Sequence, residues 1–317
     1  MYIVTGAAGF IGSNLVHELN RTGITDILLI DNLQNPAKLP NLHGARFVDY
    51  LDKRQFRKAI VENSIGLPTV KAIFHQGACS NTLEDDGAYM MDNNCEYSKD
   101  VLRYAVHAGA PFIYASTAAV YGLSGPGHFA PLWQNEKPLN VYGFSKLAFD
   151  NYVRHLIAQN ALPITVVGLR YFNVYGPREQ HKGRMASTIY HFAKQMEETG
   201  RIRLFEGSGG YGPGEQRRDF VYVRDLARMN IFFAQRPDIM HGIANAGAGQ
   251  SRSFNDVARA LMSVHGEVPI EYIPFPKDLE GRYQHFTEAD LTNLRGLGYE
   301  LPFTSLEDGV QKTFASE

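Results

Sequence analysis

The sequence predicts an α/β protein in which helices cover both faces of a doubly wound parallel sheet, joined to a smaller mixed α/β lobe. Longer segments of helical period, such as 11–22 and 89–108, alternate with short apolar runs in the first half of the chain. Strand–helix alternation of this kind implies parallel strands that are joined by right-handed crossovers. The apolar runs, which we expect to be buried strands, lie at 2–5, 27–30, 70–74, 111–115 and 164–169.

The regular alternation covers only the first part of the 317 residues. After residue 178 the chain contains a glycine-rich stretch at 207–214 and prolines within 269–276, which interrupt regular structure. A chain of this length suits one large domain or two smaller ones. We therefore predict a first domain over 1–175 and a smaller lobe over 176–317, with the chain crossing between them more than once.

Composition and charge exclude several classes of function. The formal net charge is −2 and no basic run stands out, so no nucleic-acid partner is expected. No apolar run approaches the roughly 20 residues that cross a bilayer, so no membrane span is expected. Cys79 and Cys95 have neither the spacing of a metal site nor the number of a disulfide framework. We therefore expect no metal and a reducing, cytoplasmic location.

The first predicted strand runs directly into a glycine motif, GxxGxxG, at 6–12. Gly6 permits a tight turn off the strand, Gly9 lets a pyrophosphate approach the backbone, and Gly12 lets the following helix pack on the sheet. The N-terminus of that helix then offers free N–H groups and its positive dipole end to phosphates. This order of strand, turn and helix predicts a Rossmann domain that binds a nicotinamide dinucleotide. Glycines that only turn a tight corner are the alternative.

The choice between NAD and NADP stays open on these residues. Asp31 ends the second predicted strand, 19 residues after Gly12, where an acidic residue suits the ribose hydroxyls. That carboxylate favours NAD, because it repels the extra phosphate of NADP. Lys38 and Lys53 lie nearby in the sequence. They offset the charge of Asp31 if they reach the site, and otherwise they are solvated surface lysines.

Tyr142 and Lys146 lie four residues apart and share one face if the segment is helical. The pKa of a free tyrosine is about 10, and a close ammonium or an oxidised nicotinamide favours the phenolate. Tyr142 then removes a hydroxyl proton while a hydride leaves the same carbon, and Lys146 also holds the nicotinamide ribose. Thr117, with Ser116 beside it, follows the fifth strand and is expected to hydrogen-bond the reacting oxygen. An exposed Tyr–Lys pair is the alternative.

Taken in this order, the three motifs resemble those of the extended short-chain dehydrogenase/reductases that act on nucleotide-sugars. Further segments resemble the ADP-L-glycero-D-manno-heptose 6-epimerase family nearly from end to end. His181-Lys182-Gly183, which follows YGPRE at 175–179, is the most selective of these marks. The segments that carry this resemblance lie at 75–80, 90–94, 170–179, 181–187, 218–223 and 281–284.

The resemblance implies an isomerase. Members of this family invert C6 of ADP-D-glycero-β-D-manno-heptose by transient oxidation and re-reduction with tightly bound NADP. Their product supplies heptose for the inner core of lipopolysaccharide. The resemblance also implies a homo-oligomer, often a pentamer. On the residues alone, NAD stays open as the cofactor.

The resemblance also assigns residues to the two ligands. Gln76 departs from it, because glutamate is expected at this place in many relatives. Besides the three glycines, contacts to the cofactor are implied for Phe10, Ile11, Asp31, Asn32, Lys38, Lys53, Gln76, Gly77, Ala78, Cys79, Ser80, Asn93, Lys146, Val174 and Lys182. Contacts to the ADP-sugar substrate are implied for Asn173, Arg184, His191, Phe205, Glu206, Gly207, Ser208, Arg218 and Tyr283.

Inversion at one carbon needs proton transfer in two orientations of one substrate. Tyr142 is one acid/base, and the resemblance makes Lys182 the candidate for the second. Burial near the phenol and the cofactor is expected to lower the pKa of Lys182 towards the working range. A lysine that only binds the diphosphate is the alternative. Arg184 and Arg218 are expected to bind the diphosphate, since guanidinium groups suit its two negative charges.

Other functions fit the sequence less well. A UDP-hexose 4-epimerase would share the same motifs and is the nearest rival. A dTDP-sugar 4,6-dehydratase usually has an acid–base Asp-Glu pair near the strand-five threonine, where this chain has Ala118-Ala119. Loss of the tyrosine or the lysine would support a third interpretation, a non-catalytic protein that senses the dinucleotide. Both Tyr142 and Lys146 are present, which argues against it.

Overall fold

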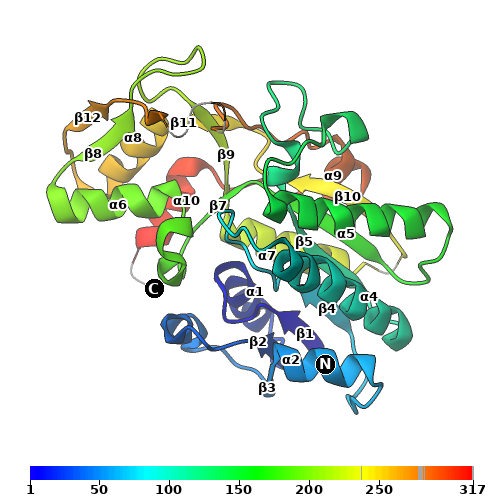
Figure 1. Cartoon of the computed structure of the whole chain (residues 1–317). Helices are drawn as coiled ribbons and strands as arrows, with labels where there is room; N and C mark the ends of the chain where they lie inside the picture. Colours follow the sequence, from blue (N-terminus) through cyan, green and yellow to red (C-terminus); the bar gives the residue numbers. More distant parts are fainter. Residues whose placement is uncertain (237, 278–280, 282, 316–317) are drawn as a thin grey trace.

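A parallel sheet forms the centre of the protein (Figure 1). The computed structural model describes residues 1–236, 238–277, 281 and 283–315. Seven strands follow the order β10-β6-β5-β4-β1-β2-β3, and each neighbouring pair is parallel. The predicted doubly wound fold is therefore confirmed. The strands are β1 (Tyr2–Thr5), β2 (Ile27–Asp31), β3 (Asp49–Asp52), β4 (Ala72–His75), β5 (Phe112–Thr117), β6 (Val166–Tyr171) and β10 (His241–Ala246).

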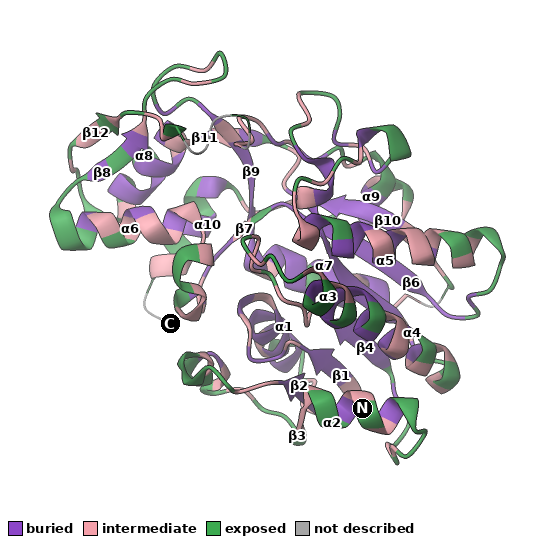
Figure 2. Ribbon diagram, viewed as in Figure 1, coloured by how far each residue is buried: buried purple, intermediate pink, exposed green. Residues whose placement is uncertain are grey.

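Helices cover both faces of this sheet because its strands are apolar on both sides. Val4 packs into the core with α1 and α7, whereas its neighbour Ile3 packs into the core with α2, α4 and α5. The strands other than the edge strand β3 are largely buried, and the outer faces of the helices are exposed (Figure 2). The helices are α1 (Phe10–Arg21), α2 (Lys53–Val61), α4 (Tyr97–Ala108), α5 (Val141–Ala158) and α7 (Val223–Ala234).

A smaller lobe lies beside the carboxyl ends of the strands. It contains a three-stranded sheet in the order β11-β9-β7 and a two-stranded sheet of β12 and β8. Phe192, Val257 and Val310, from three different helices, share its apolar core. Its elements are β7 (Asn173–Tyr175), α6 (Thr188–Thr199), β8 (Ile202–Phe205), β9 (Arg217–Tyr222), β11 (Ser251–Ser253), α8 (Phe254–His265), β12 (Ile270–Ile273) and α10 (Leu306–Phe314).

Some elements differ from the sequence-based expectation. The helix expected over 89–108 is α3 (Gly87–Met90), a π-helical segment η2 (Met91–Glu96) and α4 in succession. The last strand of the large sheet, β10, comes from beyond residue 175. The division at residue 175 stays a prediction. Arg282, part of the 281–284 segment, lies outside the described residues, as do 316–317.

The remaining elements are short. They are the 3₁₀ segments η1 (Pro36–Leu42), η3 (Ala118–Tyr121), η4 (Trp133–Asn135) and η5 (Gln180–Met185), and the helix α9 (Thr292–Gly296). Within the described ranges, no helix is both long and apolar enough to cross a bilayer.

Candidate active site

A cleft of about 770 Å³ lies at the carboxyl ends of β1, β2, β4, β5 and β6. This is the edge at which open parallel sheets bind ligands, because the loops that leave the strands meet there. Every residue predicted to contact the cofactor lines this cleft, and so do Tyr142 and Thr117. The sequence motifs, which lie far apart along the chain, are thus gathered around one space.

The glycine turn has the shape that a dinucleotide phosphate requires. Gly6 has φ +66°, and a Cβ there would lie 2.7 Å from the backbone N of Gly77. A Cβ on Gly12 would collide with the carbonyl oxygen of Gly6. Helix α1 begins at Phe10 with Gly9 as its N-cap and no side-chain cap, so its first N–H groups remain for an anion. The residues present therefore fit a bound dinucleotide.

A directional chain of hydrogen bonds braces the loops of the cleft. Thr5 Oγ1 accepts the Gly77 N–H at 3.0 Å and lies 2.8 Å from His75 Nδ1. Ser98 Oγ donates to Asn94 O at 2.6 Å and lies 2.9 Å from His75 Nε2. Because the one Ser98 proton goes to Asn94, His75 Nε2 donates to Ser98 and Nδ1 accepts from Thr5. Burial lowers the pKa of His75 to about 3, so this brace is neutral.

The ribose end of the cleft carries more positive than negative charge. Asp31 Oδ2 accepts the Ala8 N–H at 2.8 Å, and Asp31 Oδ1 pairs with Lys38 Nζ at 2.9 Å. Lys53 Nζ donates to Asn93 Oδ1 at 2.6 Å. Burial lowers the pKa of Lys53, and Asp31 opposes this. One of the two lysines balances Asp31, and the other leaves a local excess of positive charge.

The phenol and the hydroxyl that were predicted to transfer the proton meet in this cleft. Tyr142 lies in the first turn of α5, and it shares a hydrogen bond with Thr117 at the end of β5. The neighbouring Ser116 instead donates to Asp150 Oδ2 at 2.9 Å, beneath the helix. Of the two adjacent hydroxyls, the one on Thr117 is thus beside Tyr142.

Burial dominates the protonation of both Tyr142 and Lys146. Lys146 Nζ donates to the carbonyl of Ala115 at 2.9 Å, and burial lowers its pKa to about 8 while Asp150 opposes. Burial raises the pKa of Tyr142, and the hydrogen bond with Thr117 opposes this. The expected lowering of the Tyr142 pKa by the Lys146 ammonium is therefore not seen in the chain alone.

Lys182 enters the same cleft from a different element, η5. Its Nζ lies 5.0 Å from the centre of the Phe10 ring. Burial lowers the pKa of Lys182 and the Glu179 carboxylate opposes this, in the direction expected from the sequence. Glu179 also accepts hydrogen bonds from the N–H and Oγ of Ser187 at 2.5 and 2.7 Å. These hydrogen bonds join the N-terminus of α6 to Glu179 and so fix the position of the segment that carries Lys182.

The residues predicted to bind substrate fall into separate groups. Asn173 lines the cleft. Arg218 lies over the Tyr283 ring at 4.8 Å, and the Phe205 and Tyr283 rings are 6.2 Å apart. These three form a second cluster in the smaller lobe, with Glu206, Gly207 and Ser208 following directly after β8. Arg184 is exposed and His191 is half-buried in α6, and neither lines the cleft.

Other residues that line the cleft were not predicted. Asn81 and Thr82 extend the loop that begins at Gln76, and residues 185–188 lead from η5 into α6. Each of these two groups lies next to a sequence motif, and that position was the signal that could have found it. Binding residues are concentrated on loops, so the neighbours of a motif in the same loop are candidates as well. Across the described part of the chain, no group of three or more His, Cys, Asp or Glu residues could hold a metal ion.

A ring of three hydrogen bonds explains the glutamine at position 76. Gln76 Oε1 accepts from Tyr171 OH at 2.9 Å, and Gln76 Nε2 donates to Asn230 Oδ1 at 3.0 Å. Asn230 Nδ2 closes the ring with Tyr171 OH at 2.8 Å. An ionised glutamate could not donate to Asn230. The amide thus completes a neutral hydrogen-bonded cluster, two of whose members, Gln76 and Tyr171, line the cleft.

Comparisons with known proteins agree with this geometry. The model of the NAD dependent epimerase/dehydratase family matches residues 2–247. An ADP-L-glycero-D-manno-heptose-6-epimerase of Alkalilimnicola ehrlichii is 53% identical over 311 residues, which cover 98% of this chain and 95% of that protein.

Solved structures are similar over the same length. The ADP-L-glycero-D-manno-heptose-6-epimerase of Helicobacter pylori matches with a TM-score of 0.82 and 30% identity, over 98% of this chain and 94% of that one. The UDP-glucose 4-epimerase of Thermotoga maritima matches with a TM-score of 0.76 and 26% identity, over 98% and 96%. The chain therefore belongs to the NAD dependent epimerase/dehydratase family and, within it, to the ADP-L-glycero-D-manno-heptose 6-epimerases.

Proposed function

We propose that the protein converts ADP-D-glycero-β-D-manno-heptose to ADP-L-glycero-β-D-manno-heptose by inverting C6. It is an isomerase, and its product would supply heptose for the inner core of lipopolysaccharide. The observation that carries the chemistry is the presence of Tyr142 with Thr117, and of Lys182, in the cleft that holds the dinucleotide turn. The identity to the epimerase of Alkalilimnicola ehrlichii supports the substrate.

The proposed mechanism moves one proton at each of two faces of the substrate. A nicotinamide dinucleotide bound in the cleft would supply the hydride acceptor and donor for C6. The Tyr142 side chain, as the phenolate, takes the proton of the C6 hydroxyl, and the Thr117 hydroxyl hydrogen-bonds the same oxygen. The resulting ketone rotates in the cleft, and the Lys182 ammonium donates a proton to its oxygen as the carbon is reduced. Tyr142 then releases its proton to solvent and Lys182 takes one up, which restores both groups for the next turnover. The other epimer uses the two residues in the reverse order.

The pair of lysines near Asp31 supports NADP as the cofactor. The Asp31 carboxylate is already paired with Lys38, and Lys53 adds a further positive charge. The extra phosphate of NADP would therefore meet a site of net positive charge instead of a free carboxylate. NAD, which lacks this phosphate, would make the other contacts of the site but not this one.

Replacing Lys38 with Ala is expected to weaken NADP binding about 10- to 100-fold, since a charge-assisted hydrogen bond contributes about 1.5–3 kcal/mol. NAD binding should change little. Isothermal titration with both dinucleotides, after removal of any bound cofactor, measures the ratio. Lys58→Ala, on the exposed side of α2, is the matched control. Equal losses for NAD and NADP would contradict the proposed preference.

The assembly and location are also proposals. The family resemblance supports a homo-oligomer, with a pentamer expected, and light scattering of the purified chain measures its mass. The two thiols, Cys79 and Cys95, are free in the structure, which supports a reducing compartment such as the cytoplasm.

Incubation with ADP-D-glycero-β-D-manno-heptose is expected to give the C6 epimer until both epimers are present at equilibrium. NMR of the recovered sugar reads the configuration at C6, and the dinucleotide released on denaturation shows which cofactor was bound. A UDP-hexose serves as the comparison substrate. Inversion of the UDP-hexose alone would instead favour the second candidate, a UDP-hexose 4-epimerase. The similarity of this chain to the UDP-glucose 4-epimerase of Thermotoga maritima supports that candidate.

A further inference from the structure

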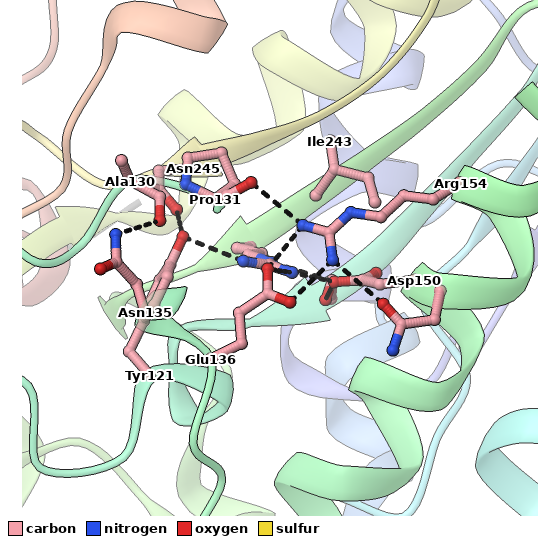
Figure 3. Close-up of polar contacts among 12 residues, drawn as sticks. Tyr121, Ala130, Pro131, Asn135, Glu136, Asp150, Arg154, Ile243 and Asn245 are labelled. Atoms are coloured by element: carbon pink, nitrogen blue, oxygen red, sulfur yellow. Dashed lines mark hydrogen bonds and ion pairs between the residues drawn. The ribbon is translucent and has the colours of Figure 1, made fainter. Parts of the chain in front are cut away.

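A buried carboxylate, Asp150, lies on α5 four residues after Lys146 (Figure 3). Its Oδ1 accepts from the Tyr114 hydroxyl at 3.0 Å. Its Oδ2 accepts from Ser116 Oγ at 2.9 Å and from Nε and Nη2 of Arg170 at 2.9 and 2.8 Å. All of these side chains are buried. Asp150 therefore ties α5 to two strands, β5 and β6, directly below the cleft.

Two further charged residues complete the cluster around Asp150. Arg170 Nη2 also contacts Glu136 Oε1 at 2.7 Å, and Arg154 Nη2 contacts the same oxygen at 2.5 Å (Figure 3). Two carboxylates and two guanidinium groups make the cluster neutral as a whole. A buried set of charges costs desolvation energy unless each one is paired. Asp150 is the carboxylate of this set on the helix that carries Lys146.

The contacts of Asp150 lead to the groups that are proposed to act on substrate. Ser116, which it binds, precedes Thr117 in β5, and the carbonyl of Ala115 accepts the hydrogen bond from Lys146. Three consecutive residues at the end of β5, 115 to 117, thus contact Lys146, Asp150 and Tyr142 in turn. A shift of α5 along β5 would break all three contacts together.

Several elements face the Lys146 ammonium. Its own helix offers Asp150, and η2 offers Cys95. From β4 comes His75, and from β5 the carbonyl of Ala115. Burial raises the pKa of Cys95 and lowers that of His75, so both are neutral near pH 7. Of these groups, Asp150 is the one whose charge opposes the loss of the lysine proton, and its pairing with Arg170 of β6 offsets part of that charge.

We propose that Asp150 is a positioning residue that keeps the Lys146 ammonium charged in its buried setting and holds α5 in register with β5. The proposal rests on the proposed function, and on the role that the sequence predicts for Lys146 within it, which is to favour the Tyr142 phenolate and to hold the nicotinamide ribose. It adds a second requirement to the tyrosine–lysine pair, namely a counter-charge one helical turn further along. Glu136 has a different part, which is to pair with both Arg170 and Arg154 and to close the cluster towards the surface.

The titration of Lys146 tests the proposal without substrate. We would label lysine with ¹³C at Cε in the cofactor-free protein, follow its signal by NMR over pH, and assign it with Lys146→Met. The wild-type midpoint is expected near pH 8. Asp150→Asn should move it about 1 unit or more to lower pH, since a nearby opposite charge shifts a pKa by that amount. Asp150→Glu should restore most of the shift.

The matched control is Glu136→Gln, which removes a carboxylate of the same cluster. Both Asp150→Asn and Glu136→Gln are expected to lower thermal stability, because each removes one of the two carboxylates that pair with the buried Arg170. Only Asp150→Asn should move the Lys146 midpoint. If Asp150→Asn does not fold, the charge-balanced double variant Asp150→Asn/Arg170→Met replaces it, and the midpoint should then move in the same direction by a smaller amount, because the Arg170 cation is removed as well.

An unchanged Lys146 midpoint in the folded Asp150 variant would overturn the proposal, and so would an equal shift in Glu136→Gln. Both outcomes are independent of the proposed reaction, because neither substrate nor turnover enters the measurement. Conversely, a wild-type protein that does not invert C6 would refute the proposed function and leave this titration as it is.

Discussion

Replacing Lys182 with Met is expected to lower the rate of inversion at C6 by at least about 10²-fold, which is the contribution of a positioned acid or base. Methionine keeps the length of the side chain but can neither accept nor donate a proton. The half-buried setting and lowered pKa of Lys182 suit it to exchange a proton at neutral pH. The dinucleotide should remain bound. The measurement is the initial rate of inversion from each epimer, together with the dinucleotide content of the purified variant.

The alternative for Lys182 is a residue that only binds the diphosphate. In that case Lys182→Met would raise KM and leave kcat nearly unchanged. Lys194→Met is the matched control, because Lys194 lies on the exposed side of α6 and pairs with Glu198 at 3.5 Å. Near-normal inversion by Lys182→Met would exclude the second acid/base and leave Tyr142 to serve both faces.

Tyr142→Phe is expected to reduce kcat by about 10²- to 10⁴-fold. The variant keeps the aromatic ring and removes only the hydroxyl that bonds Thr117. Substrate affinity should change little, so the loss should fall on kcat more than on KM. Steady-state rates at saturating substrate make this measurement.

Another tyrosine, Tyr272 in the smaller lobe, provides the control. Tyr272→Phe removes a hydroxyl that donates to Asn255 Oδ1 at 3.0 Å in the region of β12, away from the residues that line the cleft. It should leave kcat unchanged. A wild-type kcat in Tyr142→Phe would mean that the C6 hydroxyl proton leaves by another route, and the proposed role of the phenol would be wrong.

The parts of the fold that the sequence predicts well are those whose signal is local. Strand β1, the glycine turn and α1 follow one another within 2–21, and each glycine has a steric reason that is visible in the motif itself. Strand β3 (Asp49–Asp52) was not predicted because it begins and ends with an aspartate and lies at the edge of the sheet. An edge strand is half solvated and so has no continuous apolar run.

The candidate site was predictable only where a motif carried it. The tyrosine, the lysine and the cofactor loop have fixed spacings, whereas the partners of Asp150 come from 114, 116 and 170. Positions 114 and 116 share one face of β5, but no spacing in the chain relates them to 150 or to 170, which become their neighbours only when α5 packs on the sheet and β5 pairs with β6. The sequence alone could not decide whether Ser116 or Thr117 lies beside Tyr142, for a similar reason. Successive side chains of a strand point to opposite faces, so the answer depends on which face of β5 lies towards the cleft.

The place of β10 in the sheet has a consequence for how the molecule can be divided. The chain leaves the sheet after β6, builds β7, β8 and β9, and returns through α7 and β10 before it enters the smaller lobe again. Helix α7 packs on α1, β4 and β5, and β10 pairs along the whole of β6. A fragment that ended near residue 175 would leave β6 as an open edge and one apolar face of the sheet uncovered. We therefore expect that no single cut would release either lobe as a transferable module.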